Sequence, residues 1–174
     1  MAVREVALAA RRIVSPMKKD LSSIDIILRR EIEARIAEPL IRAFMEELGE
    51  ERTLAVVRRA IREQALESAA QRAKAAKGNS IRHFVESGKA WSAGDALQRE
   101  VLKLDDKTYH YNIVRCRYAE MYKELGMADL GYVLSCGRDF DMVEGFNPRM
   151  KLERTKTIMQ GGEYCDFRIS LMER

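Results

Sequence analysis

The periodicity of the apolar residues changes once along this chain, near Gly94, and that change limits the possible folds more than any other feature. Before Gly94, apolar residues recur at spacings of three and four, as the buried face of an amphipathic helix does. After it, the strings LQREVLKL and TYHYNIVRC alternate between apolar and polar residues, which is typical of strands. The sequence therefore predicts an α+β fold, with a helical N-terminal half packed on an antiparallel β-sheet formed by the C-terminal half.

Glycine and proline divide the helical half into segments. Residues 21–48 carry the longest apolar stripe; Pro39 should bend or break this helix, and Gly49 is a plausible end. A second helix is expected over 51–77, and a third from Ile81 onward, after a capping residue.

The second half should form two hairpins. Strands are expected near 97–104, 108–116, 151–159 and 164–171, because alternating runs are separated by turn-forming residues. One short helix is expected near 117–125.

Length and composition indicate one soluble unit. A chain of 174 residues with 47% hydrophobic residues suits a single α+β domain spanning 1–174, with 1–92 mainly helical and 95–174 mainly antiparallel sheet. No apolar run approaches the roughly 18 residues that a membrane span needs. The N-terminal string MAVREVALAARRIV lacks a small-residue cleavage site, so no signal peptide is expected and the location should be cytoplasmic. The net charge of +4 is modest and basic runs are short, which argues against nucleic-acid binding.

The three cysteines, Cys116, Cys136 and Cys165, all lie in the second half of the chain. An odd number of cysteines without a small-scaffold pattern indicates free thiols in a reducing compartment. Each lies in a short string rich in Arg, Asp or Tyr, so packing alone is a weak explanation for them. We expect the three to lie around one pocket.

Four strings in the second half resemble those of a known family. They are RCRYAEMYKELG at 115–126, LSCGRDF at 134–140, GFNP at 145–148 and LERTKTIMQGGEYCDFR at 152–168. The chain resembles the L-2-amino-thiazoline-4-carboxylic acid hydrolase family on these strings. The resemblance implies a hydrolase that opens a small five-membered thiazoline ring and yields an N-carbamoyl cysteine.

Ring opening of this kind needs a nucleophile or an activated water, an acid for the leaving atom and a carboxylate for the cationic amidine. Cys136, on a glycine-containing loop beside Arg138, is the candidate nucleophile, because a neighbouring guanidinium lowers a thiol pKa. Asp139 is the candidate base or amidinium partner. Arg138 or Arg154 could bind the substrate carboxylate in a bidentate manner.

Strand alternation leaves the other candidates open. Cys116 would share a face with His110, about 20 Å away, which excludes a direct dyad between them. Cys165 and Asp166 would point to opposite faces of the last strand, so only one of them reaches the pocket unless a bulge intervenes. The full set of candidates is catalytic Cys136, Asp139, Cys116, Cys165 and Asp166, and substrate-binding Arg138, Arg154, Tyr118 and Asn147.

Two alternatives to cofactor-free hydrolysis remain. The three thiols could hold a zinc ion, although no C-x2-C pair is present. The chain could also be a small-ligand-binding module or a thiol or metal sensor on the same scaffold. For partners we expect a small-molecule substrate, no membrane, and a homodimer formed through the N-terminal helices.

Overall fold

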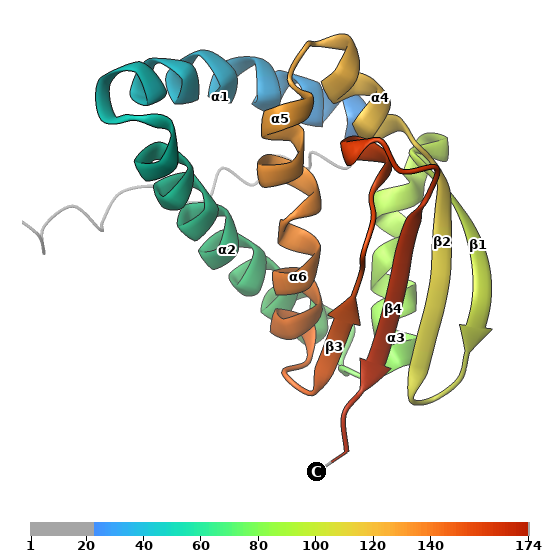
Figure 1. The fold of residues 1–174 in the computed structure, drawn as a ribbon. Coiled ribbons are helices and arrows are strands. Elements are labelled where there is room, and N and C mark those ends of the chain that lie inside the picture. The colour runs from blue at the N-terminus through green and yellow to red at the C-terminus, as the bar shows by residue number, and fades with distance from the viewer. Residues whose placement is uncertain (1–22, 174) are drawn as a thin grey trace, which may run out of the picture.

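The computed structural model describes residues 23–173, and it confirms the predicted α+β architecture (Figure 1). The helical half comprises α1 (Ile26–Leu48), α2 (Glu50–Ala75), α3 (Ile81–Ser87) and a 3-10 segment, η2 (Gly88–Asp95). The sheet comprises β1 (Leu97–Leu104), β2 (Thr108–Cys116), β3 (Met150–Glu153) and β4 (Cys165–Leu171). The connecting helices are α4 (Arg117–Glu124), α5 (Ala128–Gly131), the π-helical turn η3 (Tyr132–Cys136), α6 (Arg138–Phe146) and the 3-10 turn η4 (Ile158–Gln160).

The first two helices form a hairpin joined at Gly49. Asp25 caps α1 by accepting hydrogen bonds from the N–H groups of Ile27 and Leu28 at 3.0 and 3.1 Å. Gly49 adopts a φ of +84°, which most residues avoid, and so ends α1 where the sequence predicted. Of the bend or break expected at Pro39, the break is absent, because α1 runs on through that residue.

The four strands form one antiparallel sheet in the order β1-β2-β4-β3. One face is buried under the helices and carries Tyr111, Ile113, Phe167 and Ile169. The other face carries half-buried polar residues such as His110. This one-sided burial is what the alternating sequence predicted.

A bulge near the end of β2 changes which way Cys116 points. Gln98 pairs with Arg115 but Arg99 pairs with Ile113, so Val114 is an extra residue in β2. As a result Cys116 is buried, as Ile113 is, and is not on the half-buried face that strict alternation predicted with His110.

The second half contains more helix than the sequence predicted. The helix expected near 117–125 is present as α4, but α5, η3 and α6 stand where the sequence predicted no helix. The strand predicted over 151–159 ends at Glu153, and the chain then runs irregularly to η4. The other three predicted strands match β1, β2 and β4 closely.

Helix α6 lies between α2 and the sheet (Figure 1), so it brings the LSCGRDF string into the interior. The approach to α2 is close: a Cβ on Gly145 would lie 2.7 Å from the carbonyl oxygen of Leu66. Only glycine allows this contact without displacing backbone.

The N-terminal string MAVREVALAARRIV lies outside the described residues. Within residues 23–173, none of the helices combines the length and the apolar character needed to cross a membrane.

Candidate functional site

A cavity of about 150 Å³ lies between the helices and the buried face of the sheet. Helices α1 and α2 contribute Arg30, Gln64 and Arg72 to its wall, and the sheet contributes Tyr111 and Phe167. The cavity is also lined by Cys116, Tyr118, Cys136, Arg138, Asp139, Arg154 and Cys165. Seven of the nine candidates chosen from the sequence therefore meet at one place, and the three cysteines share one pocket as predicted.

Cys136 lies on the π-helical turn η3, not on the glycine loop that the sequence suggested. The N–H of Gly137 donates to the carbonyl of Tyr132 at 2.7 Å, which closes a wider turn than an α-helix has. Single π-turns inside helices are often found at functional sites, because they re-aim the side chains at their ends.

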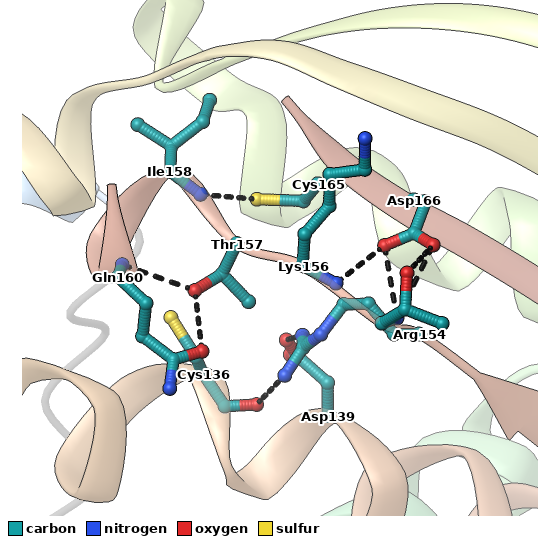
Figure 2. Close-up of polar contacts among 10 residues, drawn as sticks. Cys136, Asp139, Arg154, Lys156, Thr157, Ile158, Gln160, Cys165 and Asp166 are labelled. Carbon is teal, nitrogen blue, oxygen red and sulfur yellow. Dashed lines mark hydrogen bonds and ion pairs between the residues drawn. The ribbon is translucent and has the colours of Figure 1, made fainter. Parts of the chain in front are cut away.

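Arg154 links Asp139 to the backbone of Cys136 (Figure 2). Its guanidinium donates to the Asp139 carboxylate at 2.6 Å and to the carbonyl oxygen of Cys136 at 2.9 Å. The rings of Phe140 and Phe167 lie 5.0 and 5.1 Å from the guanidinium carbon. The side chain is only 2% exposed, so Arg154 acts as a fixed brace for Cys136 and Asp139.

Asp139 is the carboxylate of the cavity. About 36% of its side chain is accessible, but it lines the cavity, so this surface is not evidence of contact with bulk water. Burial raises the pKa of Asp139, even though Arg154 acts to lower it. Such a carboxyl can both take up and release a proton nearer to neutral pH than an ordinary aspartate can.

The three thiols differ in their contacts. The Sγ of Cys116 accepts a hydrogen bond from the N–H of Ala119 and caps α4, and the Sγ of Cys165 accepts one from the N–H of Ile158. No such bond engages the Sγ of Cys136 within residues 23–173. Of the three, Cys136 therefore has the sulfur most available to a ligand.

The expected lowering of the thiol pKa was wrong. Burial raises the pKa of Cys116 to about 12 and also raises the pKa of Cys165. Burial raises the pKa of Cys136 further, with the Asp139 charge adding to the effect and Arg154 opposing it. The resting cavity therefore holds thiols, not thiolates.

Two candidates lie outside the cavity lining. Asp166 accepts hydrogen bonds from the Thr155 N–H, the Thr155 hydroxyl and the Lys156 N–H, so it pins the irregular segment after β3 (Figure 2). Burial acts to raise the pKa of Asp166, but these hydrogen bonds lower it. Of the two neighbours in β4 it is thus Cys165 that reaches the cavity.

Asn147 has a similar bridging role after α6. Its amide donates to the carbonyl oxygen of Asn79 at 2.9 Å and accepts from the N–H of Arg149 at 2.9 Å. These contacts tie the end of α6 to the segment before α3.

Tyr118 and Arg138 are cavity residues with partners of their own. The Tyr118 hydroxyl donates to the carbonyl oxygen of Trp91 at 3.0 Å, and burial raises its pKa to about 12. Arg138 donates to the side-chain oxygen of Gln64 at 2.8 Å.

The sequence missed the cavity residues that come from α2 and β1. Arg72 and Arg99 were not among the candidates from the sequence, yet both line the cavity. Their strings, QRAKAAK and LQREVLKL, contain several exposed charges, and nothing in the spacing separates the inward arginine from the outward ones.

Among residues 23–173, no three His, Cys, Asp or Glu side chains group closely enough to hold a metal ion. The three-thiol zinc site considered from the sequence therefore finds no matching cluster in this part of the chain.

Comparison with known proteins gives one family and a fold likeness. The family model described as L-2-amino-thiazoline-4-carboxylic acid hydrolase matches residues 29–169. No curated protein matches the sequence.

Two solved structures resemble this one. One is a trafficking protein particle complex subunit 3 from Naegleria fowleri covalently bound to palmitic acid, at 12% identity and a TM-score of 0.50, covering 84% of this chain and 96% of that one. The other is the phenol-responsive sensory domain of the transcription activator PoxR with phenol, at 14% identity and a TM-score of 0.49, covering 76% and 71%. At these identities the first likeness concerns the fold alone.

Proposed function

The chain belongs to the L-2-amino-thiazoline-4-carboxylic acid hydrolase family, and from that premise we propose that its cavity opens a small cyclic amidine-like ring. The substrate is of the type of L-2-amino-thiazoline-4-carboxylate, and the product is N-carbamoyl-L-cysteine. The observation that carries the proposal is the convergence of Cys136, Asp139 and Arg154 in one cavity. A volume of about 150 Å³ suits a ligand of one small ring, since an engineered apolar cavity of that size binds benzene.

The product defines the bond that breaks. In N-carbamoyl-L-cysteine both nitrogens remain on the former ring carbon, so the carbon–sulfur bond is the one cleaved. One water is consumed: its oxygen becomes the carbamoyl oxygen, and the ring sulfur leaves as a thiol.

Asp139 carries the protons in this proposal. Its carboxylate takes a proton from the attacking group as the new bond forms, and then returns it to the departing ring sulfur. Its raised pKa supports both steps, and Arg154 keeps the carboxylate in place.

Cys136 is the proposed attacking group, and it reacts from the neutral thiol. Its proton passes to Asp139 as the sulfur adds to the amidine carbon, since the resting site does not favour a thiolate. Water then releases the carbamoyl product and restores the thiol. Cys116 and Cys165 line the cavity without reacting, because their sulfurs already accept backbone hydrogen bonds.

The test is turnover of L-2-amino-thiazoline-4-carboxylate by the purified full-length protein. Asp139→Asn and Cys136→Ala should each reduce kcat by about 10²- to 10⁴-fold while the far-UV circular dichroism is retained. Cys116→Ser is the matched control and should change kcat much less. Loss of activity in Asp139→Asn alone would mean that water attacks directly and that Cys136 is not the nucleophile.

Ligand binding without turnover is the second candidate function. The burial of the thiols and their raised pKa values favour it over redox sensing, because sensor cysteines are exposed and have low pKa values. A protein that binds the substrate tightly but leaves it intact would support this candidate against hydrolysis.

A further inference from the structure

The cavity wall holds more positive charge than the site chemistry uses. It includes Arg30, Arg72, Arg99, Arg138 and Arg154, but Asp139 is its one carboxylate. Two of these charges are balanced: Arg154 pairs with Asp139 at 2.6 Å, and Arg30 pairs with Glu33 at 2.5 Å.

Arg72 and Arg99 have no carboxylate within 4.0 Å among residues 23–173. Each is held instead by a backbone carbonyl and an aromatic ring. Arg72 donates to the carbonyl of Ser87 at 3.4 Å, and Arg99 donates to the next carbonyl, that of Gly88, at 3.3 Å. The two guanidinium groups, one from α2 and one from β1, therefore meet at the same turn between α3 and η2.

The aromatic contacts fix the orientation of both groups. The guanidinium carbon of Arg72 lies 5.0 Å from the centre of the Trp91 ring, and that of Arg99 lies 5.5 Å from the centre of the Tyr111 ring. All four side chains line the cavity. The Nε of Arg99 is buried and has no hydrogen-bond partner among the described residues.

A buried donor without a partner, such as the Nε of Arg99, is costly to a fold, and two half-buried cations without a counter-charge add to that cost. Burial, followed by repulsion from Arg30 and Arg29, lowers the pKa of Arg72, which reflects the same excess of positive charge. An anion in the cavity would relieve both costs, and a carboxylate matches the forked donors of guanidinium.

We propose that Arg72 and Arg99 form a carboxylate-binding subsite, which selects small ring compounds bearing a carboxylate over neutral ones. The proposal rests on the proposed function for the position of the reacting ring. It assigns the substrate carboxylate to Arg72 and Arg99 in place of Arg138 and Arg154. Those two residues already bond to Gln64 and to Asp139. With the carboxylate held beside Trp91 and Tyr111, the rest of the ring extends toward Cys136 and Asp139, which line the same cavity.

The test separates binding from turnover by using rings that do not open. Isothermal titration would compare 2-aminothiazole-4-carboxylate with 2-aminothiazole, which lacks the carboxylate. The wild-type protein should bind the acid about 10- to 100-fold more tightly, the usual effect of charge-assisted hydrogen bonds. Arg99→Met and Arg72→Met should each remove most of that preference while leaving the affinity for 2-aminothiazole unchanged.

Arg82→Met is the matched control, because Arg82 is an exposed arginine paired with Asp106 outside the cavity. It should keep the full preference for the acid. Unchanged affinity for the neutral ring shows that a variant has folded. If both methionine variants lose that affinity, Arg99→Lys serves instead: it keeps the charge and should retain a reduced preference for the acid.

Equal binding of the two rings by the wild-type protein would overturn the subsite, whatever the protein hydrolyses. A preserved preference in both arginine variants would overturn it as well. Preferred binding of the acid without any turnover would leave the subsite standing and would defeat the hydrolase proposal instead.

Discussion

Asp139 and Cys136 illustrate how an environment sets the chemistry of a residue. The sequence shows a thiol three positions from a carboxyl and two from an arginine, and that pattern suggested a thiolate. The fold buries the set, and desolvation outweighs the nearby cation. That these residues line one cavity was predictable from the sequence, but their protonation states were not, because burial depends on α1, α2 and the sheet together.

The first prediction at this scale concerns pH. A base must be deprotonated to act, so kcat/KM should fall as the pH drops through the pKa of Asp139, which lies above the ordinary 3.8. The pH profile of kcat/KM measures this, with circular dichroism confirming that the protein stays folded. A profile that stays flat down to pH 4 would rule out Asp139 as the base.

The second prediction concerns thiol reactivity. Alkylation requires the thiolate, so raised pKa values should make all three cysteines react slowly with iodoacetamide. At pH 7.5 the native protein should be labelled at least about 10-fold more slowly than the urea-unfolded protein. Mass spectrometry of the labelled peptides gives each rate, and rapid native labelling of Cys136 would contradict the raised pKa.

At the scale of elements, the periodicity of apolar residues predicted the helices and strands that are long enough to show several repeats. The helices α1 and α2 and the strands β1, β2 and β4 were expected close to where they stand. The short α6 was not, because Gly137 and Gly145 in its string suggest a loop until α2 is present to accept the close approach. The bulge at Val114 could not be predicted from the sequence either, since it is defined by the pairing of two strands.

Helix α6 gives a prediction about stability. Gly145→Ala would place a methyl group against the backbone of Leu66, so it should lower the free energy of unfolding by about 1–3 kcal/mol. Gly137→Ala, next to the same helix, meets its nearest backbone oxygen at 3.3 Å and should change stability much less. Urea unfolding of the two variants measures both free energies of unfolding. Equal losses of stability would mean that the close α2–α6 contact is not what makes Gly145 necessary.

At the scale of the whole molecule, α1 presents an apolar ridge to solvent. The ridge consists of Leu28, Ile32, Ile36, Leu40, Phe44 and Leu48, all roughly half exposed or more. Residues spaced four apart form a ridge on a helix, and such ridges pack into the grooves of a second helix in the commonest crossing geometry. Exposed apolar surface of this extent indicates an interface.

We propose that a second copy of this chain covers the ridge. Residues 26–37 contain more arginine than glutamate, and residues 38–48 contain more glutamate than arginine. Two copies of α1 related by a two-fold axis and running antiparallel would set each half against its opposite. This charge pattern favours self-association over packing against an unrelated helix.

The proposal predicts a dimer that dissociates when charged side chains are introduced on the ridge. Ile36→Glu together with Leu40→Glu should convert the protein to a monomer with unchanged circular dichroism, because both side chains are exposed and neither lines the cavity. Sedimentation velocity measures the outcome, with Val101→Glu on the exposed part of β1 as the control. A monomeric wild-type protein at micromolar concentration would exclude the dimer.

The π-helical turn at Tyr132–Cys136 holds one residue more than a regular helical turn would. Each residue of an α-helix advances about 100° around the axis, so deleting one here would rotate α5 against α6 by that angle. Gly131 packs on Met159 and Gly145 packs on Leu66, and the two contacts could not both be kept after such a rotation. A difference of one residue in chain length at this turn would therefore distinguish relatives that keep this cavity from relatives that keep only its scaffold.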